Sequence, residues 1–313
     1  MENMVISGTT IEPGCNEIIR LTVGRLPSDT RIYIRAHVFR STEPGPTILA
    51  MAGVHGDEIN GVEIVRRLIA NGTLEHLKRG TVIAIPLLNI YGFINFSREV
   101  PDGKDVNRSF PGHSTGSLAS RVANAITKKI LPSVDFGVDF HTGGSNNYNY
   151  PQIRYSKGDA ASKKLAETFS PPYLLANRPI PKSLRKAGLD LGKPILTYEG
   201  GENLRFDGFA IEKGLEGMMR ILKSENMLEA DIPPCTSITF EKTTWIRASR
   251  AGLFRWSKRS GNRICKGECL GVINDPYGLE EIPVLARHDG YIIGHNNAPV
   301  VSTGDALFHV GFA

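Results

Sequence analysis

The sequence predicts an α/β protein: a mixed, largely parallel sheet with flanking helices, followed by a small C-terminal all-β, barrel-like domain. Two buried strand-like runs, 47–54 and 81–88, enclose a segment in which apolar residues recur with helical spacing. A strand, a helix and a second strand in this order are typical of a βαβ unit and a parallel sheet. After Ile232-Pro-Pro234 the chain changes to short β-like runs separated by turns. We therefore expect a large α/β domain over residues 1–232 and a small β domain over residues 233–313.

The composition limits the class of protein. The chain has 313 residues, and its hydrophobic fraction of 41% and charged fraction of 22% are those of a folded, soluble protein. The net charge of +5 comes from scattered lysines and arginines, so a small anionic substrate fits better than a nucleic acid. The absence of a signal-peptide pattern and of an apolar run near the ~20 residues that span a bilayer argues against a membrane partner. The four cysteines lack zinc-ribbon or disulfide-framework spacing, so a cytoplasmic location is expected.

The remaining elements follow along the chain. The runs 17–23 and 31–39 have strand character within a hairpin of about residues 16–40, and 26–30 forms the expected turn. A helix is expected from Glu58 to Ala70, with Asn71-Gly72 as its stop signal. Beyond it we expect, in order, a helix at 117–131, a strand at 134–141, helices at 160–169 and 183–191, a strand at 195–198 and a helix at 210–226.

A histidine and a glutamate mark the junction between the central strand and the helix after it. His55 and Glu58 lie in a glycine-flanked loop, where an imidazole nitrogen and a carboxylate can turn towards one point. Zinc accepts such a pair and needs a third protein ligand, with a fourth position left for water. Taken singly, this spacing occurs often by chance in ordinary polar loops.

His141 supplies the candidate third ligand. It ends a strand and precedes Thr142-Gly-Gly, at the kind of strand terminus where α/β sheets place their sites. Asp139 lies two residues earlier, on the same strand face, and can orient an imidazole; a helix cap or a surface salt bridge explains it equally well. Three zinc-type ligands at strand ends favour a metal site, although histidine and carboxylate ligands also accept other first-row metals.

A long loop over residues 89–112 adds polar residues. It is too long for an idle connection, and long loops in compact domains often carry function. Arg98 and Arg108 offer guanidinium groups for a carboxylate, and Asn107 can hydrogen-bond the same group. Surface arginines are common, so this loop alone would not indicate a site.

In this order, His55, Glu58, Arg98, Asn107, Arg108, His141 and Glu199 resemble the succinylglutamate desuccinylase/aspartoacylase family of zinc amidohydrolases. The resemblance covers roughly residues 45–225 and implies the fold of the zinc carboxypeptidases. It makes residues 1–232 a zinc-dependent catalytic domain with one zinc ion, Zn²⁺, per chain.

The resemblance also assigns roles. It implies that His55, Glu58 and His141 hold the zinc, that Glu199 activates the attacking water, and that Arg98 polarises the scissile carbonyl. Asn107 and Arg108 would hold the carboxylate of the substrate. Glu202 is an alternative to Glu199, but Glu199 directly ends the predicted strand 195–198.

The stretch 149–154 is similar to bacterial members of the family that differ from the aspartoacylases themselves. Deacetylases of acetylated diamino acids are among such members. Arg154, in this stretch, is a candidate for substrate contact, with a structural salt bridge as the alternative. The expected activity is hydrolysis of an N-acyl amino acid.

The C-terminal segment contains a half-repeat. Gly252-Leu-Phe with 264–270 is similar to Gly290-Tyr-Ile with 301–307, which is typical of a small lipoyl- or biotinyl-type barrel. A carrier of that type needs a modifiable lysine at its hairpin tip, and Arg287-His-Asp-Gly290 has none. A structural or substrate-shaping domain is therefore favoured.

Other functions stay open at this stage. A metallocarboxypeptidase would use the same zinc and arginine arrangement on peptides, and a non-catalytic binding protein could retain the metal site. An intact Glu199 argues against the second option, because a binder needs no proton shuttle. The sequence leaves the acyl group, the amino acid and the oligomeric state open, with a homo-oligomer as one option.

Overall fold

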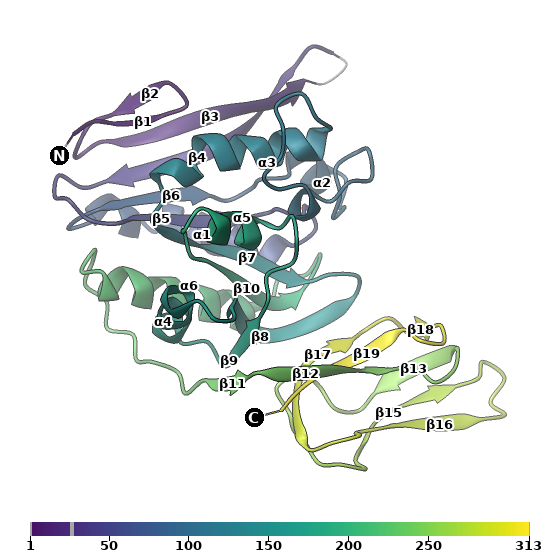
Figure 1. Cartoon of the computed structure of the whole chain (residues 1–313). Coiled ribbons are helices and arrows are strands. Elements are labelled where there is room, and N and C mark those ends of the chain that lie inside the picture. The colour runs from purple at the N-terminus through teal and green to yellow at the C-terminus, as the bar shows by residue number, and fades with distance from the viewer. Residues whose placement is uncertain (1, 26–27, 313) are drawn as a thin grey trace.

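The computed structural model describes residues 2–25 and 28–312 (Figure 1). The strands of its first half and the helices have the following bounds: β1 (Met4–Ile6), β2 (Thr9–Ile11), β3 (Asn16–Arg25), β4 (Arg31–Arg40), β5 (Thr47–Ala52), α1 (Ile59–Ala70), η1 (Thr73–His76), β6 (Thr81–Ile85), α2 (Ile90–Ile94), η2 (Val106–Arg108), α3 (Leu118–Lys129), η3 (Leu131–Ser133), β7 (Phe136–Gly143), β8 (Asn147–Ser156), α4 (Ala160–Phe169), β9 (Tyr173–Asn177), α5 (Leu184–Asp190), β10 (Ile195–Glu202) and α6 (Gly208–Ser224). The C-terminal strands are β11 (Ile238–Phe240), β12 (Lys242–Arg247), β13 (Gly252–Trp256), β14 (Arg263–Ile264), β15 (Cys269–Asn274), β16 (Glu281–Leu285), β17 (Gly290–Asn296), β18 (Val300–Val301) and β19 (Ala306–Phe312).

One 13-stranded sheet dominates the molecule, with β12-β19-β17-β8-β10-β7-β5-β6-β4-β3 as its main path. Its centre, β10-β7-β5-β6, is parallel, whereas β3, β4 and β8 join it in antiparallel fashion. The predicted fold class, a mixed and largely parallel sheet with flanking helices and C-terminal β structure, is therefore confirmed.

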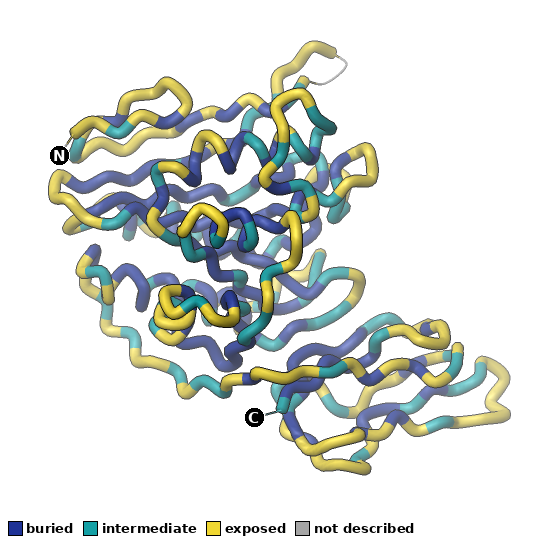
Figure 2. Tube along the Cα trace, viewed as in Figure 1, coloured by how far each residue is buried: buried dark blue, intermediate teal, exposed yellow. Residues whose placement is uncertain are grey.

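Helices cover the two faces of the central sheet. On one face α1, α4 and α6 pack over β5, β7 and β10, and Ile64, Phe169 and Met218 belong to a single buried cluster there. On the other face α3 and α5 contribute Val122 and Leu184 to a second cluster. Because both faces are covered, the central strands are almost uniformly apolar, and Figure 2 shows them buried beneath the helices.

The predicted elements occur near their expected positions. The strand 47–54 ends at Ala52, and the helix expected at 58–70 begins at Ile59. The predicted turn at 26–30 includes residues 26 and 27, which lie outside the described residues. Strands β8 and β9 were not predicted: Pro151 and polar residues interrupt the apolar pattern of β8, and β9 is a run of five residues that directly follows Pro171 and Pro172.

The C-terminal strands extend the large sheet. The segment β17 pairs with the first half of β8, with Gly294 opposite Asn149, and β19 and β12 continue outwards from β17. The two similar segments of the half-repeat pair crosswise, Gly252 with Val301 and Ile264 with Gly290. The boundary at residue 232 and the type of small domain stay predictions.

In the described part of the chain, no helix combines the length and apolar character needed to cross a membrane.

Candidate active site

The carboxyl ends of three neighbouring parallel strands position the candidate residues. His55 follows β5, His141 lies in β7, and Glu199 lies in β10 directly beside His141 in the strand register. Glu58 occupies the N-cap of α1, where its side chain makes no capping bond and is free to turn towards the histidines. Parallel strands bring their carboxyl ends to one edge of the sheet, so residues far apart in sequence meet here.

Glycine makes the loop between β5 and α1 possible. Gly53 has φ of +65°, a left-handed conformation that other residues adopt at a cost. A Cβ on Gly56 would lie 1.9 Å from the Gly92 carbonyl carbon, so a side chain there would drive the loop away from α2. The loop that carries His55 is thus held against the segment that leads to Arg98.

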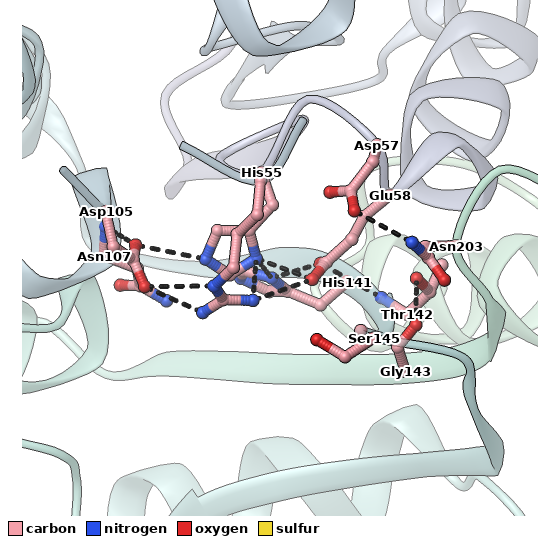
Figure 3. Close-up of polar contacts among 12 residues, drawn as sticks. His55, Asp57, Glu58, Asp105, Asn107, His141, Thr142, Gly143, Ser145 and Asn203 are labelled. Carbon is pink, nitrogen blue, oxygen red and sulfur yellow. Dashed lines mark hydrogen bonds and ion pairs between the residues drawn. The ribbon is translucent and has the colours of Figure 1, made fainter. Parts of the chain in front are cut away.

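The structure brings His55, Glu58 and His141 together as a buried cluster. One ligand atom from each lies within 4.8 Å of the others. His55 Nδ1 is 2.6 Å from Glu58 Oε1, His141 Nδ1 is 2.7 Å from Glu58 Oε2, and the two Nδ1 atoms are 3.2 Å apart. Figure 3 shows both rings and the carboxylate directed at one point.

The opposite nitrogen of each ring faces a carboxylate. His55 Nε2 is 3.2 Å from Asp105 Oδ1, and His141 Nε2 is 2.7 Å from Asp139 Oδ2. The expected contact between Asp139 and an imidazole is therefore present. A carboxylate accepts a hydrogen bond, so each Nε2 is the donor in these contacts, and Nδ1 is the ring nitrogen that faces the cluster.

The electrostatics of the three side chains favour a cation between them. Burial opposes protonation of His141, but Asp139 and Glu58 outweigh it and raise the pKa of that imidazole well above its ordinary value. Burial likewise opposes ionisation of Glu58, yet the two histidines hold the pKa of its carboxyl well below the usual range. Two ring nitrogens and a carboxylate that converge within such distances suit a divalent cation, and the chemistry of these donors fits zinc.

Arg98 lies beside the cluster. Its Nη1 is 3.3 Å from Glu58 Oε1, while Nε and Nη2 contact Asp105 Oδ2 at 3.2 and 2.8 Å. Asp105 therefore orients both His55 and Arg98, which fixes the guanidinium relative to the donor atoms. Asp105 lies in the long loop 89–112 and was not predicted as a site residue.

Every residue predicted for the site lines one cavity of about 470 Å³. It is lined by the donor cluster and by Arg98, Asn107, Arg108, Arg154 and Glu199. Asn107 Oδ1 accepts the Leu184 backbone N–H at 2.9 Å, so this amide also anchors the start of α5. Arg108 is exposed, with its Nη1 donating to the Asn107 carbonyl at 2.8 Å.

The carboxylate of Glu199 is held at both oxygens. Asn149 Nδ2 donates to Oε2 at 2.9 Å, and Arg154 Nη1 is 3.2 Å from Oε1. Arg154 thus forms the salt bridge that was one of its two expected roles and also lines the cavity, whereas its contact with substrate stays a prediction. Asn149 was not predicted as a site residue.

Arg185 and Trp245 also line the cavity and were missed from the sequence. Arg185 is buried, its Nη1 has no hydrogen-bond partner among the described residues, and burial with the nearby Arg154 charge lowers its pKa to about 10. Trp245, in β12, stacks on His309 with ring centroids 4.5 Å apart. Neither residue could be found from the local sequence, because Arg185 lies within a helical pattern and Trp245 lies in a strand far along the chain.

Comparison with known proteins shows which class of protein has this fold. The chain has the fold of a solved succinylglutamate desuccinylase/aspartoacylase from Rhodobacter sphaeroides, with a TM-score of 0.83, 25% identity, and 95% of this chain and 96% of that one covered. The product-bound ectoine utilization protein EutE (DoeB) from Ruegeria pomeroyi gives a TM-score of 0.85 at 23% identity, with 96% and 95% covered. The catalytic-domain model described as succinylglutamate desuccinylase/aspartoacylase matches residues 44–224, so the chain belongs to this family of deacylases, as predicted.

A curated relative is similar over most of the chain. The N-alpha-acetyl-L-2,4-diaminobutyric acid deacetylase of Halomonas elongata is 25% identical over 286 residues, which are 84% of this chain and 81% of the relative.

Proposed function

We propose that this protein is a zinc-dependent hydrolase that cleaves the amide bond of an N-acyl amino acid. The observation that carries the proposal is the convergence of the His55, Glu58 and His141 donor atoms with Glu199 in one cavity. Family membership and the named activity of the Halomonas relative support the same reaction class.

His55, Glu58 and His141 would hold the zinc ion. When bound, zinc in such a site lowers the pKa of a water molecule to about 7 and polarises a carbonyl group. Asp105 and Asp139 support the ligands by keeping each imidazole in one tautomer and one orientation.

Glu199 acts as general base and then as general acid. Its carboxylate takes the proton of the attacking water and delivers it to the departing nitrogen, which yields a carboxylate and a free amine. Arg98 donates to the carbonyl oxygen as negative charge develops there, and one such donor is typically worth about 3 kcal/mol. Asp105 keeps the Arg98 guanidinium in place before substrate arrives.

The other polar residues bind the substrate. Arg108 and Asn107 hold its carboxylate, and this orientation places the amide beside Glu199. Arg154 and Arg185 bring further positive charge to the cavity. The Arg154 charge is paired with Glu199, so Arg185 is the guanidinium that would repel a cationic side chain, and we favour neutral or acidic N-acyl amino acids over acetylated diamino acids.

A substrate panel tests the function. Zinc-loaded protein is incubated with acetyl, succinyl and longer acyl derivatives of acidic, neutral and diamino acids, and with short peptides. Release of acyl carboxylate and free amino acid supports the proposal. Release of C-terminal amino acids from peptides alone would instead identify a carboxypeptidase, and inertness towards the whole panel would favour a binding protein.

Replacing Arg108 with alanine is expected to raise KM by about tenfold to a hundredfold with little change in kcat, since a charge-assisted hydrogen bond contributes roughly 1.5–3 kcal/mol to binding. Steady-state kinetics on the best substrate of the panel measures this effect. Lys104→Ala is the matched control, because Lys104 is an exposed cation of the same loop that does not line the cavity. An unchanged KM in the Arg108 variant would contradict its role as carboxylate ligand.

A further inference from the structure

Strand β8 contains a bulge beside Glu199. Gln152 lies directly opposite Glu199, but the next aligned pair is Asn149 with Gly201, so three steps along β8 correspond to two steps along β10. Side chains alternate along a strand, and an extra residue reverses which face the following ones occupy. The register shift therefore brings Asn149 opposite Gly201, where an unbroken ladder would place Tyr150.

Asn149 uses this position to hold the carboxylate. Its Nδ2 donates to Glu199 Oε2 at 2.9 Å, and both side chains are buried. A hydrogen bond to an ionised group is short and directional, so it restricts rotation of the carboxylate about its last torsion. Arg154 contacts the other oxygen, and the two contacts together fix the plane of the carboxylate.

The side chain of Asn149 is in turn set by the C-terminal segment. Gly294 of β17 lies opposite Asn149, and a Cβ at Gly294 would lie 2.7 Å from Asn149 Oδ1. Such an approach is too close for two heavy atoms that do not bond. The atom in the way is the end of a flexible side chain, so a methyl group could be accommodated by rotating the amide. The next nearest atom, the Tyr148 carbonyl oxygen, would be 3.1 Å away.

We infer that Gly294 and Asn149 form a positioning pair, through which a strand of the C-terminal segment sets the orientation of Glu199. The inference rests on the proposed role of Glu199 as the proton carrier. Gly294 does not line the cavity, and Asn149 Oδ1 is the nearest atom that a Cβ at Gly294 would meet. Orientation matters here because a displacement of about 1 Å in a reacting group can cost about a hundredfold in rate.

A double-mutant cycle tests the pair. Gly294→Ala, Asn149→Ala and the double variant are compared with the wild type for kcat, KM and bound zinc. We expect each single variant to lower kcat by about tenfold to a hundredfold, with KM and zinc content unchanged. The double variant is expected to be no slower than Asn149→Ala, because the added methyl then meets no amide.

Several outcomes would overturn the inference. Independent structural damage would make the two losses multiply in the double variant. A Gly294→Ala protein that is folded and has wild-type kcat would show that the methyl group does not disturb Glu199. Should Gly294→Ala fail to fold, a wild-type kcat for Asn149→Ala would alone refute the pair, and a reduced kcat with normal KM would support it.

The proposed function is tested separately in the same experiment. An active Glu199→Gln protein would refute the catalytic role of Glu199. An inactive Glu199→Gln protein beside unaffected Gly294 and Asn149 variants would refute only the positioning pair.

Discussion

Replacing Glu199 with glutamine is expected to lower kcat by about a hundredfold to ten-thousandfold, the usual contribution of a general acid–base group. Glutamine keeps the size of the side chain and can still contact Asn149, but it cannot take a proton from water. The metal donors are untouched, so zinc content should stay at about one ion per chain. Single-turnover kinetics combined with metal analysis measures both quantities.

Glu202→Gln is the matched control for this substitution. Glu202 lies on the same strand, and its Oε2 accepts a hydrogen bond from Asn297 Nδ2 at 2.8 Å. It was the alternative carboxylate in the sequence, and it does not line the cavity. If the Glu202 variant lost activity while the Glu199 variant stayed active, Glu202 and not Glu199 would be the general base.

Replacing His141 with alanine is expected to weaken zinc binding by more than about a hundredfold and to abolish turnover. Loss of a residue that only supports a metal ligand already costs about tenfold to a hundredfold in affinity, and His141 supplies a donor atom itself. The protein should still fold, because strand β7 keeps its neighbours on both sides. Calorimetric titration of the metal-free protein with zinc measures the affinity.

Thermal unfolding adds an independent readout for the His141 variant. A ligand that binds only the native state raises Tm, so zinc should stabilise the wild type and leave His141→Ala unchanged. His113→Ala is the control, because His113 is an exposed histidine whose ring contacts Thr115. Equal zinc affinity in wild type and His141→Ala would contradict the donor role.

Local patterns explain how much of the site could be predicted. His55 and Glu58 stand together at a strand-to-helix junction, and His141 ends a strand before glycines, so the rule that sites lie at the carboxyl edge of a parallel sheet applies to each. The family resemblance added Arg98, Asn107, Arg108 and Glu199. Their common cavity is now seen, whereas their individual roles stay predictions for the substitutions above to test.

The residues that were missed depend on long-range pairing. Asn149 lies opposite Gly201 because the pairing of β8 with β10 shifts register beside Glu199, and no local pattern reveals a shift that arises from strand pairing. Arg185 and Trp245 reach the cavity from α5 and from the C-terminal segment, respectively. Strand β8 was missed for a related reason, since its polar residues Asn147, Asn149 and Arg154 line the cavity and so disrupt the apolar alternation expected of a strand.

The pairing of β17 with β8 also bears on how the protein acquires its structure during synthesis. The first half of β8 keeps an open edge until residues 290–296 have left the ribosome, because β17 is the strand that covers it. An open strand edge of this kind can pair with other chains. A nascent polypeptide that lacks residues 290–296 would therefore carry an aggregation-prone edge next to Glu199. The first half of β8 therefore gains its second neighbouring strand only once the C-terminal segment is in place.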